Sequence, residues 1–488
     1  MRLAIIFLSL CIPVIRAADR PNVVFILTDD QRADAMSCAG HPFLRTPHID
    51  KLASEGVRFT NAFVTTSLCS PSRASILSGL YAHTHGVSNN FTDYPAGLNS
   101  YPLQLQKQGY KTAYIGKWHM GEDNDAARPG FDYFVTHKGQ GNYFDTEFNF
   151  GGDRGRKVVS GYYTDGVTEL AKEWLAEQKS DQPFCLIIGH KAPHTPFTPA
   201  PRHADIYKDI TVGYPGSAFH LEGKPGWVQQ RIDTWHGIYG PIYGFRKEFP
   251  DSSPFDVEHF SEFAKAYTAS ILAVDDSVGQ VYSTLQSMGC LDDTVLIFTS
   301  DNGFFLGEHG MSDKRTMHEA SIKVPLIVRY PAKAAAGTIM NHQVLNIDFA
   351  PTILELCSAP PMQGIHGLSW APLLDNPESP WRDGWYYEYN YEKQFPYTPN
   401  VRGIRTNEWK YIRYPHGDGS PDRHMAELYH LPSDPDEANN LINNPVYHQQ
   451  AAQLRERLEE LMKATGATAF HMPMDEGIKK TLPDASIR

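Results

Sequence analysis

Cysteine is scarce in this chain, which has 488 residues and only six cysteines. No two of them form a CxxC pair or show the spacing of a zinc site. Cys11 lies near the start and Cys69 opens a motif described below. The remaining four are expected to be buried thiols or to form one or two disulfides, rather than a metal cluster: Cys38, Cys185, Cys290 and Cys357.

Basic residues are also in deficit. The chain has 56 acidic against 44 basic residues and a formal net charge of −12. The surface as a whole should therefore repel nucleic acid and acidic membranes. Any site for an anion must gather its cations locally.

Long apolar runs are missing beyond the first residues, and the chain has no internal repeat or low-complexity tract. The opening MRLAIIFLSLCIPVIRAADR has one early Arg, an apolar run from Leu3 to Leu10 and small residues at Ala17 and Ala18. This pattern predicts a signal peptide over residues 1–17. The run is well short of the roughly 20 residues that a span needs, so we expect export, to a periplasmic, secreted or lysosomal location, rather than a membrane anchor.

The composition, 41% hydrophobic and 20% charged, is typical of a globular protein with a large core. From 21 to 375, runs such as PNVVFILTDD and DDTVLIFTSDNG alternate with amphipathic helical patterns. This alternation predicts a mostly parallel α/β sheet with helices on both faces. Short aromatic strands and one helical pattern over 376–470 predict a smaller antiparallel subdomain, followed by a polar, loosely ordered tail at 471–488.

An insertion rich in Gly, Pro, Trp and Tyr interrupts the large domain near 200–262. Its aromatic side chains could stack on sugar rings, or could simply pack the insertion onto the domain: Trp227, Trp235, Tyr239 and Tyr243.

Polar residues stand where the predicted strands end, which is where open α/β sheets bind ligands. They are Asp29, Asp30, Lys117, His119, His190, His194, Asp301 and Asn302. The oxygen donors among them (Asp29, Asp30, Asp301 and Asn302) suit Ca²⁺ or Mg²⁺, and zinc is disfavoured. Each acidic pair alone could equally be a turn or a helix cap.

The stretch SLCSPSRASILSG predicts a short helix, with Ser70 as N-cap, Pro71 at the first position and Gly79 at the end. Cys69 would then lie just outside a helix N-terminus, where free N–H groups favour an anion and Arg73 adds a cation. That field should lower the pKa of the thiol and make it reactive. The alternative is that Cys69 forms a disulfide.

Several motifs, in order along nearly the whole chain, resemble the type I formylglycine-dependent sulfatases of the alkaline phosphatase superfamily. They are RPNVVFILTDDQ, CSPSRASILSG, YIGKWHMG, KAPHTPF, TSDNGFFLGEHG, IKVPLIVRYP and ELYHLPSDPDEANNL. The C-x-P-S-R signature is intact, with Ser78 where Thr is commoner. The stretches around Cys69 and after DKR look most like N-acetylglucosamine-6-sulfatases and related polysaccharide sulfatases.

The resemblance implies that a formylglycine-generating enzyme oxidises Cys69 to formylglycine, whose hydrate is the nucleophile. Asp29, Asp30, Asp301 and Asn302, with the modified Cys69, would hold one Ca²⁺. Arg73 and Lys117 would hold the hydrate, and Lys117, His194 and Lys314 would bind sulfate. His119 would be the base that collapses the sulfated hydrate, and His194 is the candidate proton donor to the leaving group.

The expected activity is removal of O-sulfate from a sulfated carbohydrate, with N-acetylglucosamine 6-sulfate as one candidate. A phosphomonoester or phosphonate hydrolase on the same fold is the closest alternative, and a non-catalytic secreted glycan-binding protein is an alternative of another class. His83 and His85, which follow the nucleophile helix, are expected just outside the reacting groups.

Overall fold

The structure is a computed structural model that describes residues 20–231, 254–467 and 472–479. A mixed eight-stranded sheet forms its centre, and only β11 runs antiparallel to its neighbours. The order is β12 (Thr338–Leu345), β2 (Val57–Phe63), β11 (Lys323–Arg329), β8 (Thr294–Ser300), β1 (Asn22–Thr28), β7 (Phe184–Gly189), β3 (Lys111–Gly116) and β4 (Tyr133–Val135). The predicted mostly parallel sheet is confirmed.

Both faces of this sheet are covered by helices, as the continuous apolar strand sequences require. Along β1, Val23, Phe25 and Leu27 join one core cluster, while Val24 and Ile26 join the other. The first face carries α2 (Cys69–Ser78), α3 (Ala82–His85), α4 (Tyr101–Lys107), α9 (Phe349–Leu356) and α10 (Ala371–Asp375). The second carries α1 (Pro47–Glu55), α5 (Tyr163–Ala176) and the long α7 (Pro254–Ser287).

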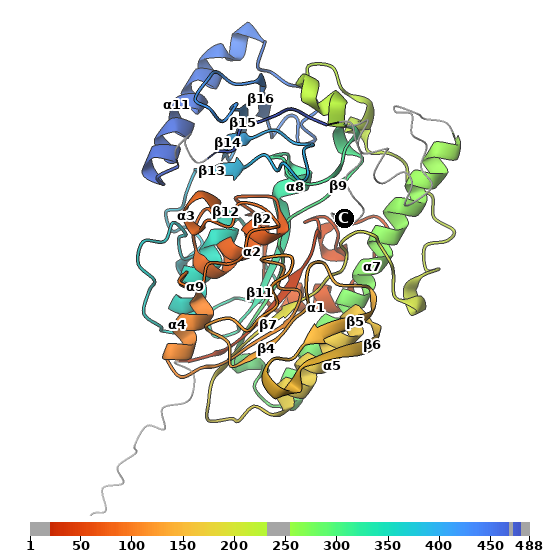
Figure 1. Ribbon diagram of the computed structural model, residues 1–488, viewed down its shortest axis with the longest axis vertical. Helices are drawn as coiled ribbons and strands as arrows, with labels where there is room; N and C mark the ends of the chain where they lie inside the picture. The colour runs from red at the N-terminus through yellow and green to blue at the C-terminus, as the bar shows by residue number, and fades with distance from the viewer. Residues whose placement is uncertain (1–19, 232–253, 468–471, 480–488) are drawn as a thin grey trace, which may run out of the picture.

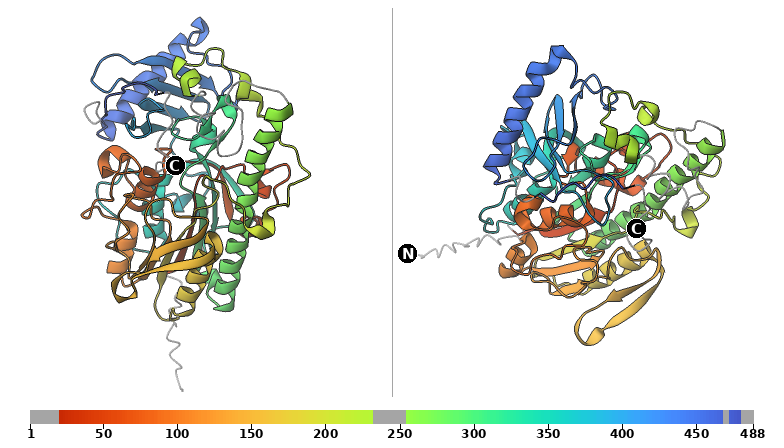
Figure 2. Two further views of the ribbon diagram at one scale, coloured as in Figure 1. Left: turned by 45° about the vertical axis from the view of Figure 1, so that its right-hand side comes forward. Right: turned by 45° about the horizontal axis from the view of Figure 1, so that its top comes forward.

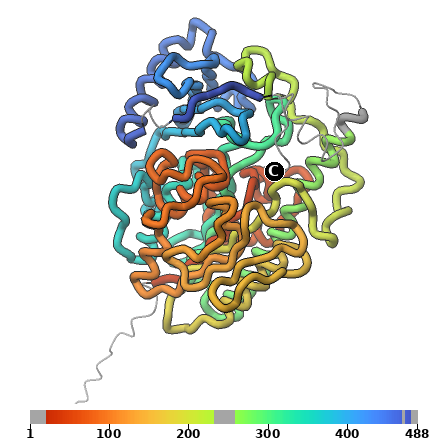
Figure 3. The backbone as a smooth tube through the Cα atoms, in the orientation of Figure 1, coloured from red at the N-terminus to blue at the C-terminus, as the bar shows by residue number. Residues whose placement is uncertain are grey.

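A second, antiparallel sheet forms the C-terminal subdomain, as expected. It comprises β13 (Gly384–Tyr389), β14 (Val401–Thr406), β15 (Trp409–Tyr414) and β16 (His424–His430), with α11 (His448–Ala464) beside it. Figures 1 and 2 show this blue part at one end of the molecule, and the tube in Figure 3 shows it above the red and orange parts. Leu454 and Leu458 of α11 are buried in the core cluster of the first face.

Small elements complete the chain. They are the hairpin of β5 (Phe144–Asn149) and β6 (Arg156–Tyr162), the pair β9 (Phe305–Leu306) and β10 (Ser312–Asp313), and α8 (Glu319–Ile322). Single 3-10 turns lie at Ser37–Ala39, Gly152–Arg154, Pro201–His203, Gly216–Phe219, Leu291–Asp293, Glu308–Gly310, Asn346–Asp348 and Pro445–Tyr447.

The structure changes some expectations. The long helix α7 begins at Pro254, inside the predicted 200–262 insertion. In the predicted tail, Asp475 is buried and its N–H donates to the His416 carbonyl at 2.9 Å, so this part of it is packed against the subdomain. Among the described residues all five cysteines are free thiols, so the disulfide alternatives are wrong there. No described helix combines the length and apolar character that crossing a membrane requires, and the predicted signal peptide lies outside the described residues.

Candidate active site

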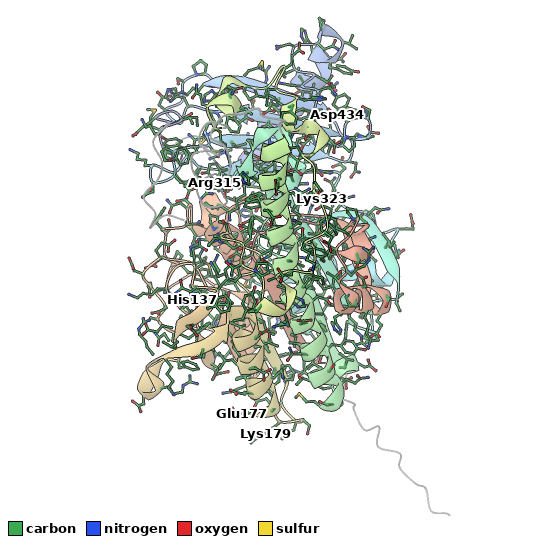
Figure 4. The ribbon with its side chains drawn as sticks, turned by 90° about the vertical axis from the view of Figure 1, so that its right-hand side faces the viewer. His137, Glu177, Lys179, Arg315, Lys323 and Asp434 are labelled. Atoms are coloured by element: carbon green, nitrogen blue, oxygen red, sulfur yellow. The ribbon has the colours of Figure 1, made fainter. Side chains whose placement is uncertain are left out.

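The polar residues predicted at strand ends converge at the carboxyl edge of the central sheet, because β8, β1, β7 and β3 are adjacent and parallel. This edge faces the C-terminal subdomain: Figure 4 shows Arg315 in the upper half of the molecule and Glu177 and Lys179, which precede β7, at its lower end. Gly116 has φ 109°, and a Cβ there would lie 2.1 Å from the Gly189 carbonyl oxygen. Glycine is therefore required for the close approach of β3 and β7.

Three carboxylates form the floor of the site. Asp29, Asp30 and Asp301 are each fully buried, and one oxygen of each lies within 4.8 Å of the others. Burial raises the pKa of Asp30 to about 7, and the neighbouring carboxylates add to the effect against the opposing Lys314. The Asn302 amide donates to Asp30 Oδ1 at 2.5 Å, but Asn302 Oδ1 and Asp30 Oδ2 are buried without a hydrogen-bond partner in the described chain. These unsatisfied hard oxygens fit a divalent cation such as Ca²⁺.

Three cations neutralise these carboxylates. Arg73 Nε donates to Asp301 Oδ2 at 2.8 Å, Lys117 Nζ donates to Asp29, and Lys314 Nζ donates to Asp30. Burial alone would raise the pKa of Asp29, but Lys117 and Arg73 hold it below its usual value. The site thus gathers three buried cations, which balance its three carboxylates, in a protein whose net charge is negative.

Cys69 is the first residue of α2, fully buried, with its Sγ 3.6 Å from Asp29 Oδ1. The predicted capping is wrong: Leu68 occupies the N-cap, and the Ser70 hydroxyl donates to the His119 carbonyl. Gly79 ends the helix at φ 71°, as predicted. The expected low thiol pKa is also wrong, because burial, together with Asp29, raises the pKa of Cys69 well above its usual value.

His119 is held by a partner that the sequence did not reveal. Its Nε2 donates to Glu122 Oε1 at 2.9 Å, while Nδ1 is buried without a hydrogen-bond partner among the described residues. Burial lowers the pKa of His119 well below its usual value, and Lys117 adds to this effect. The ring is thus neutral, with Nδ1 available to accept a proton.

His194 faces the same centre and His190 does not. His194 Nδ1 donates to the Thr195 carbonyl at 2.6 Å, which leaves Nε2 3.7 Å from Asp30 Oδ2. Burial and Lys117 lower the pKa of His194 well below its usual value, so Nε2 carries no proton in this state. His190 Nε2 instead lies 3.2 Å from the Ser277 hydroxyl of α7, on the other side of the sheet.

The remaining predicted residues lie apart from the reacting groups. His83 joins Glu388 of the C-terminal subdomain at 2.9 Å, and His85 lies 3.1 Å from the Ser75 hydroxyl in the second half of α2. Trp227 is fully buried against Tyr414, so it packs the insertion onto the domain and does not offer a surface for sugar stacking. The other three predicted aromatic residues lie outside the described residues: Trp235, Tyr239 and Tyr243.

The sequence analysis missed three residues that line this centre. Glu122 holds His119, the Gln140 side chain accepts from Lys117 Nζ, and Lys191 donates to the Gln140 carbonyl at 3.3 Å. Lys191 opens the noted motif KAPHTPF and Glu122 directly follows the noted motif YIGKWHMG, whereas Gln140 belongs to a loop after β4 without any such signal.

Comparison with known families identifies the chain. A family model described as Sulfatase matches residues 21–359. The chain belongs to the sulfatase family. A second model, described as N-sulphoglucosamine sulphohydrolase, C-terminal, matches residues 307–464 and so includes the antiparallel sheet and α11. The protein is a sulfuric ester hydrolase with the alkaline phosphatase fold.

Relatives of this sulfatase are similar over most of their length. An N-acetylglucosamine-6-O-sulfatase of Bacteroides thetaiotaomicron is 33% identical over 497 residues, covering 91% of this chain and 86% of the relative. The human N-acetylglucosamine-6-sulfatase is 27% identical over 502 residues, covering 92% and 86%. The solved structure of BT4656 with its substrate D-glucosamine-2-N,6-O-disulfate has a TM-score of 0.83 and 32% identity, covering 94% of this chain and 99% of that one.

The fold by itself does not distinguish sulfate from phosphonate esters. A phosphonate monoester hydrolase of Agrobacterium radiobacter has a TM-score of 0.71 at 23% identity, covering 91% of this chain and 96% of that one. Substrate class must therefore be argued from the site.

Proposed function

We propose that this sulfatase removes O-sulfate from a sulfated carbohydrate, with N-acetylglucosamine 6-sulfate units of a glycosaminoglycan as the first candidate. The observation that carries the proposal is the buried cluster of Arg73, Lys117 and Lys314 around Cys69 in a chain of the sulfatase family. The names of its relatives support the saccharide class.

The four oxygen-donor residues would hold one Ca²⁺, together with the modified Cys69. The unpartnered Asn302 Oδ1 and Asp30 Oδ2 support this assignment, because buried oxygen donors of this kind are the ligands that Ca²⁺ prefers. Bound Ca²⁺ would supply positive charge to the sulfate oxygens. Asp30 would then remain ionised at neutral pH, since a neighbouring cation favours the carboxylate form.

Cys69 is proposed to be converted to formylglycine by a formylglycine-generating enzyme. The hydrate would supply the oxygen nucleophile that a buried thiol of raised pKa does not. Arg73, ion-paired with Asp301, keeps a fixed positive charge beside this position. Lys117 and Lys314 would bind the sulfate oxygens once Asp29 and Asp30 hold the cation, which stabilises the developing charge.

Two histidines would move protons. His119 is neutral, and its Nδ1 has no other partner among the described residues, so it would take a proton from the nucleophile side. His194 is neutral here, but a bound anionic ester would raise its pKa, and the charged Nε2–H could then donate to the substrate.

We also propose export, on the sequence of residues 1–17 alone. A saccharide polymer outside the cytoplasm would be a consistent substrate. The chain would need to meet the formylglycine-generating enzyme before or during export.

The test is release of sulfate and phosphate from a panel of sulfated glucosamine, galactosamine and uronate saccharides and a phosphate monoester. Protein co-expressed with a formylglycine-generating enzyme is compared with a Cys69→Ala control. Sulfate release that the control lacks supports the proposal, and the preferred sugar names the substrate. Phosphate release that persists in Cys69→Ala would show a phosphoesterase, and binding without any release would show a glycan-binding protein.

A further inference from the structure

One lysine at the centre has no ion-pair partner among the described residues. Lys191 follows β7 and is 2% exposed, and its Nζ donates to the Gln140 carbonyl at 3.3 Å. The Nζ also lies 5.2 Å from the centre of the Tyr143 ring. Within the described residues no carboxylate is ion-paired with it, whereas Arg73, Lys117 and Lys314 are each paired with an aspartate.

Burial without an ion-pair partner in the described chain destabilises the charged form of Lys191. Burial, together with Lys117, lowers the pKa of Lys191 to about 7, and the opposing charges of Asp29 and Asp30, which are not ion-paired with it, do not offset this. Buried charges in folded proteins are normally paired or bind a ligand. A negative charge that arrives with the substrate would supply the missing partner.

Lys191 is linked by hydrogen bonds to the groups proposed to bind the scissile sulfate, through Gln140 and through its own carbonyl. Gln140 contacts both lysines, since its side chain accepts from Lys117 and its carbonyl accepts from Lys191. The Lys191 carbonyl accepts from the His194 N–H at 2.9 Å, and Tyr143 OH donates to the His194 carbonyl at 2.6 Å. Gln140 is half-buried, so the lysine lies beside a side chain that reaches solvent.

The charge balance points the same way. Three carboxylates face three paired cations, and a bound divalent cation would add further positive charge. That cation alone would exceed the single negative charge of one sulfate monoester, and Lys191 adds to the excess. Such a site favours a substrate with more than one acidic group.

We propose that Lys191 forms a subsite for a second acidic group of the substrate, a further sulfate or a carboxylate on the same sugar or the next one. The proposal rests on the proposed function. Lys191 would then provide the preference for doubly charged over singly charged saccharides, while other residues hold the scissile sulfate.

The experiment compares kcat/KM for glucosamine 2-N,6-O-disulfate and for N-acetylglucosamine 6-sulfate. We expect the wild type to favour the disulfate by about tenfold or more, as a charge-assisted contact provides, and Lys191→Met to lose most of that ratio through KM. Lys191→Arg should retain it. Lys138→Met, which removes an exposed lysine from the loop that carries Gln140, is the matched control.

Binding of the same two saccharides to Cys69→Ala protein, with and without Lys191→Met, gives a second readout that needs no turnover. An unchanged affinity ratio, or an equal fall for both saccharides, would overturn the subsite. Absence of sulfate release from all saccharides by formylglycine-containing wild type would instead overturn the proposed function, and the binding ratio would still decide the role of Lys191.

Discussion

Replacement of Glu122 tests how the His119 base is held. The Glu122 carboxylate accepts from His119 Nε2 at 2.9 Å, and the glutamate side chain is 32% exposed. Hydrogen bonds to charged groups contribute about 1.5–3 kcal/mol, and partial exposure favours the lower end. Since ~1.4 kcal/mol is a tenfold change in rate, Glu122→Ala should lower kcat about tenfold or somewhat more.

KM should change little, because Glu122 contacts His119 and none of the groups proposed to bind sulfate. Glu122→Gln should fall between wild type and Glu122→Ala, since the amide oxygen still accepts from Nε2–H without a full charge. The neighbouring Asp123 is exposed, so Asp123→Asn is the matched control. Steady-state kinetics on the preferred sulfated saccharide measure the effect, and a Glu122→Ala variant with more than half of wild-type kcat would refute the reasoning.

Three further predictions concern the metal, the core and acid stability. Asn302→Ala should weaken Ca²⁺ binding. Ca²⁺ at 100 times its Kd should stabilise the wild type by about 2.7 kcal/mol. The difference in Tm between protein with Ca²⁺ and protein with chelator should therefore be smaller in the variant than in the wild type. Trp227→Ala should lower the free energy of unfolding by about 3–5 kcal/mol in urea, whereas under 1 kcal/mol would indicate a surface aromatic. Burial raises the pKa of Glu388, but the hydrogen bond and charge of His83 outweigh it and lower that pKa to about 2. This stabilisation is present above about pH 4.3 and is lost as the pH falls towards 2. Glu388→Gln should therefore lower the free energy of unfolding more at pH 7 than at pH 3. Equal costs in urea at both pH values would contradict it.

Much of the site could be predicted from sequence because parallel strands place their ends together. Asp29, Lys117, His194 and Asp301 follow four apolar strand sequences, and all four meet at one sheet edge. The prediction needed no knowledge of strand order. It failed for His190, which also follows β7 but faces α7 instead.

Local reasoning failed where burial competes with a local effect. The helix N-terminus at Cys69 predicts a low thiol pKa, but the thiol is fully buried beside Asp29, and desolvation prevails. Tryptophan is a residue type that often stacks on sugar rings. Trp227 nevertheless packs against Tyr414 of β15, almost two hundred residues later in the chain.

The sequence by itself determined the alternation of strands and helices, the inventory of oxygen donors and cations, and the family, because these depend on residue types and their local spacing. Only the tertiary structure decided which charges are paired. Glu122 and Asp123 are adjacent acids, and only the fold directs the first one to His119. Lys191 opens the motif KAPHTPF, but the sequence assigns it no role. Its burial, with no ion-paired carboxylate among the described residues, is what distinguishes it from the paired lysines beside it. The pairing of Glu122 with His119, three residues away, depends on the backbone conformation between them. The surroundings of Lys191 depend on Gln140 and Tyr143, which lie far from it in the chain, and residue types alone specify neither.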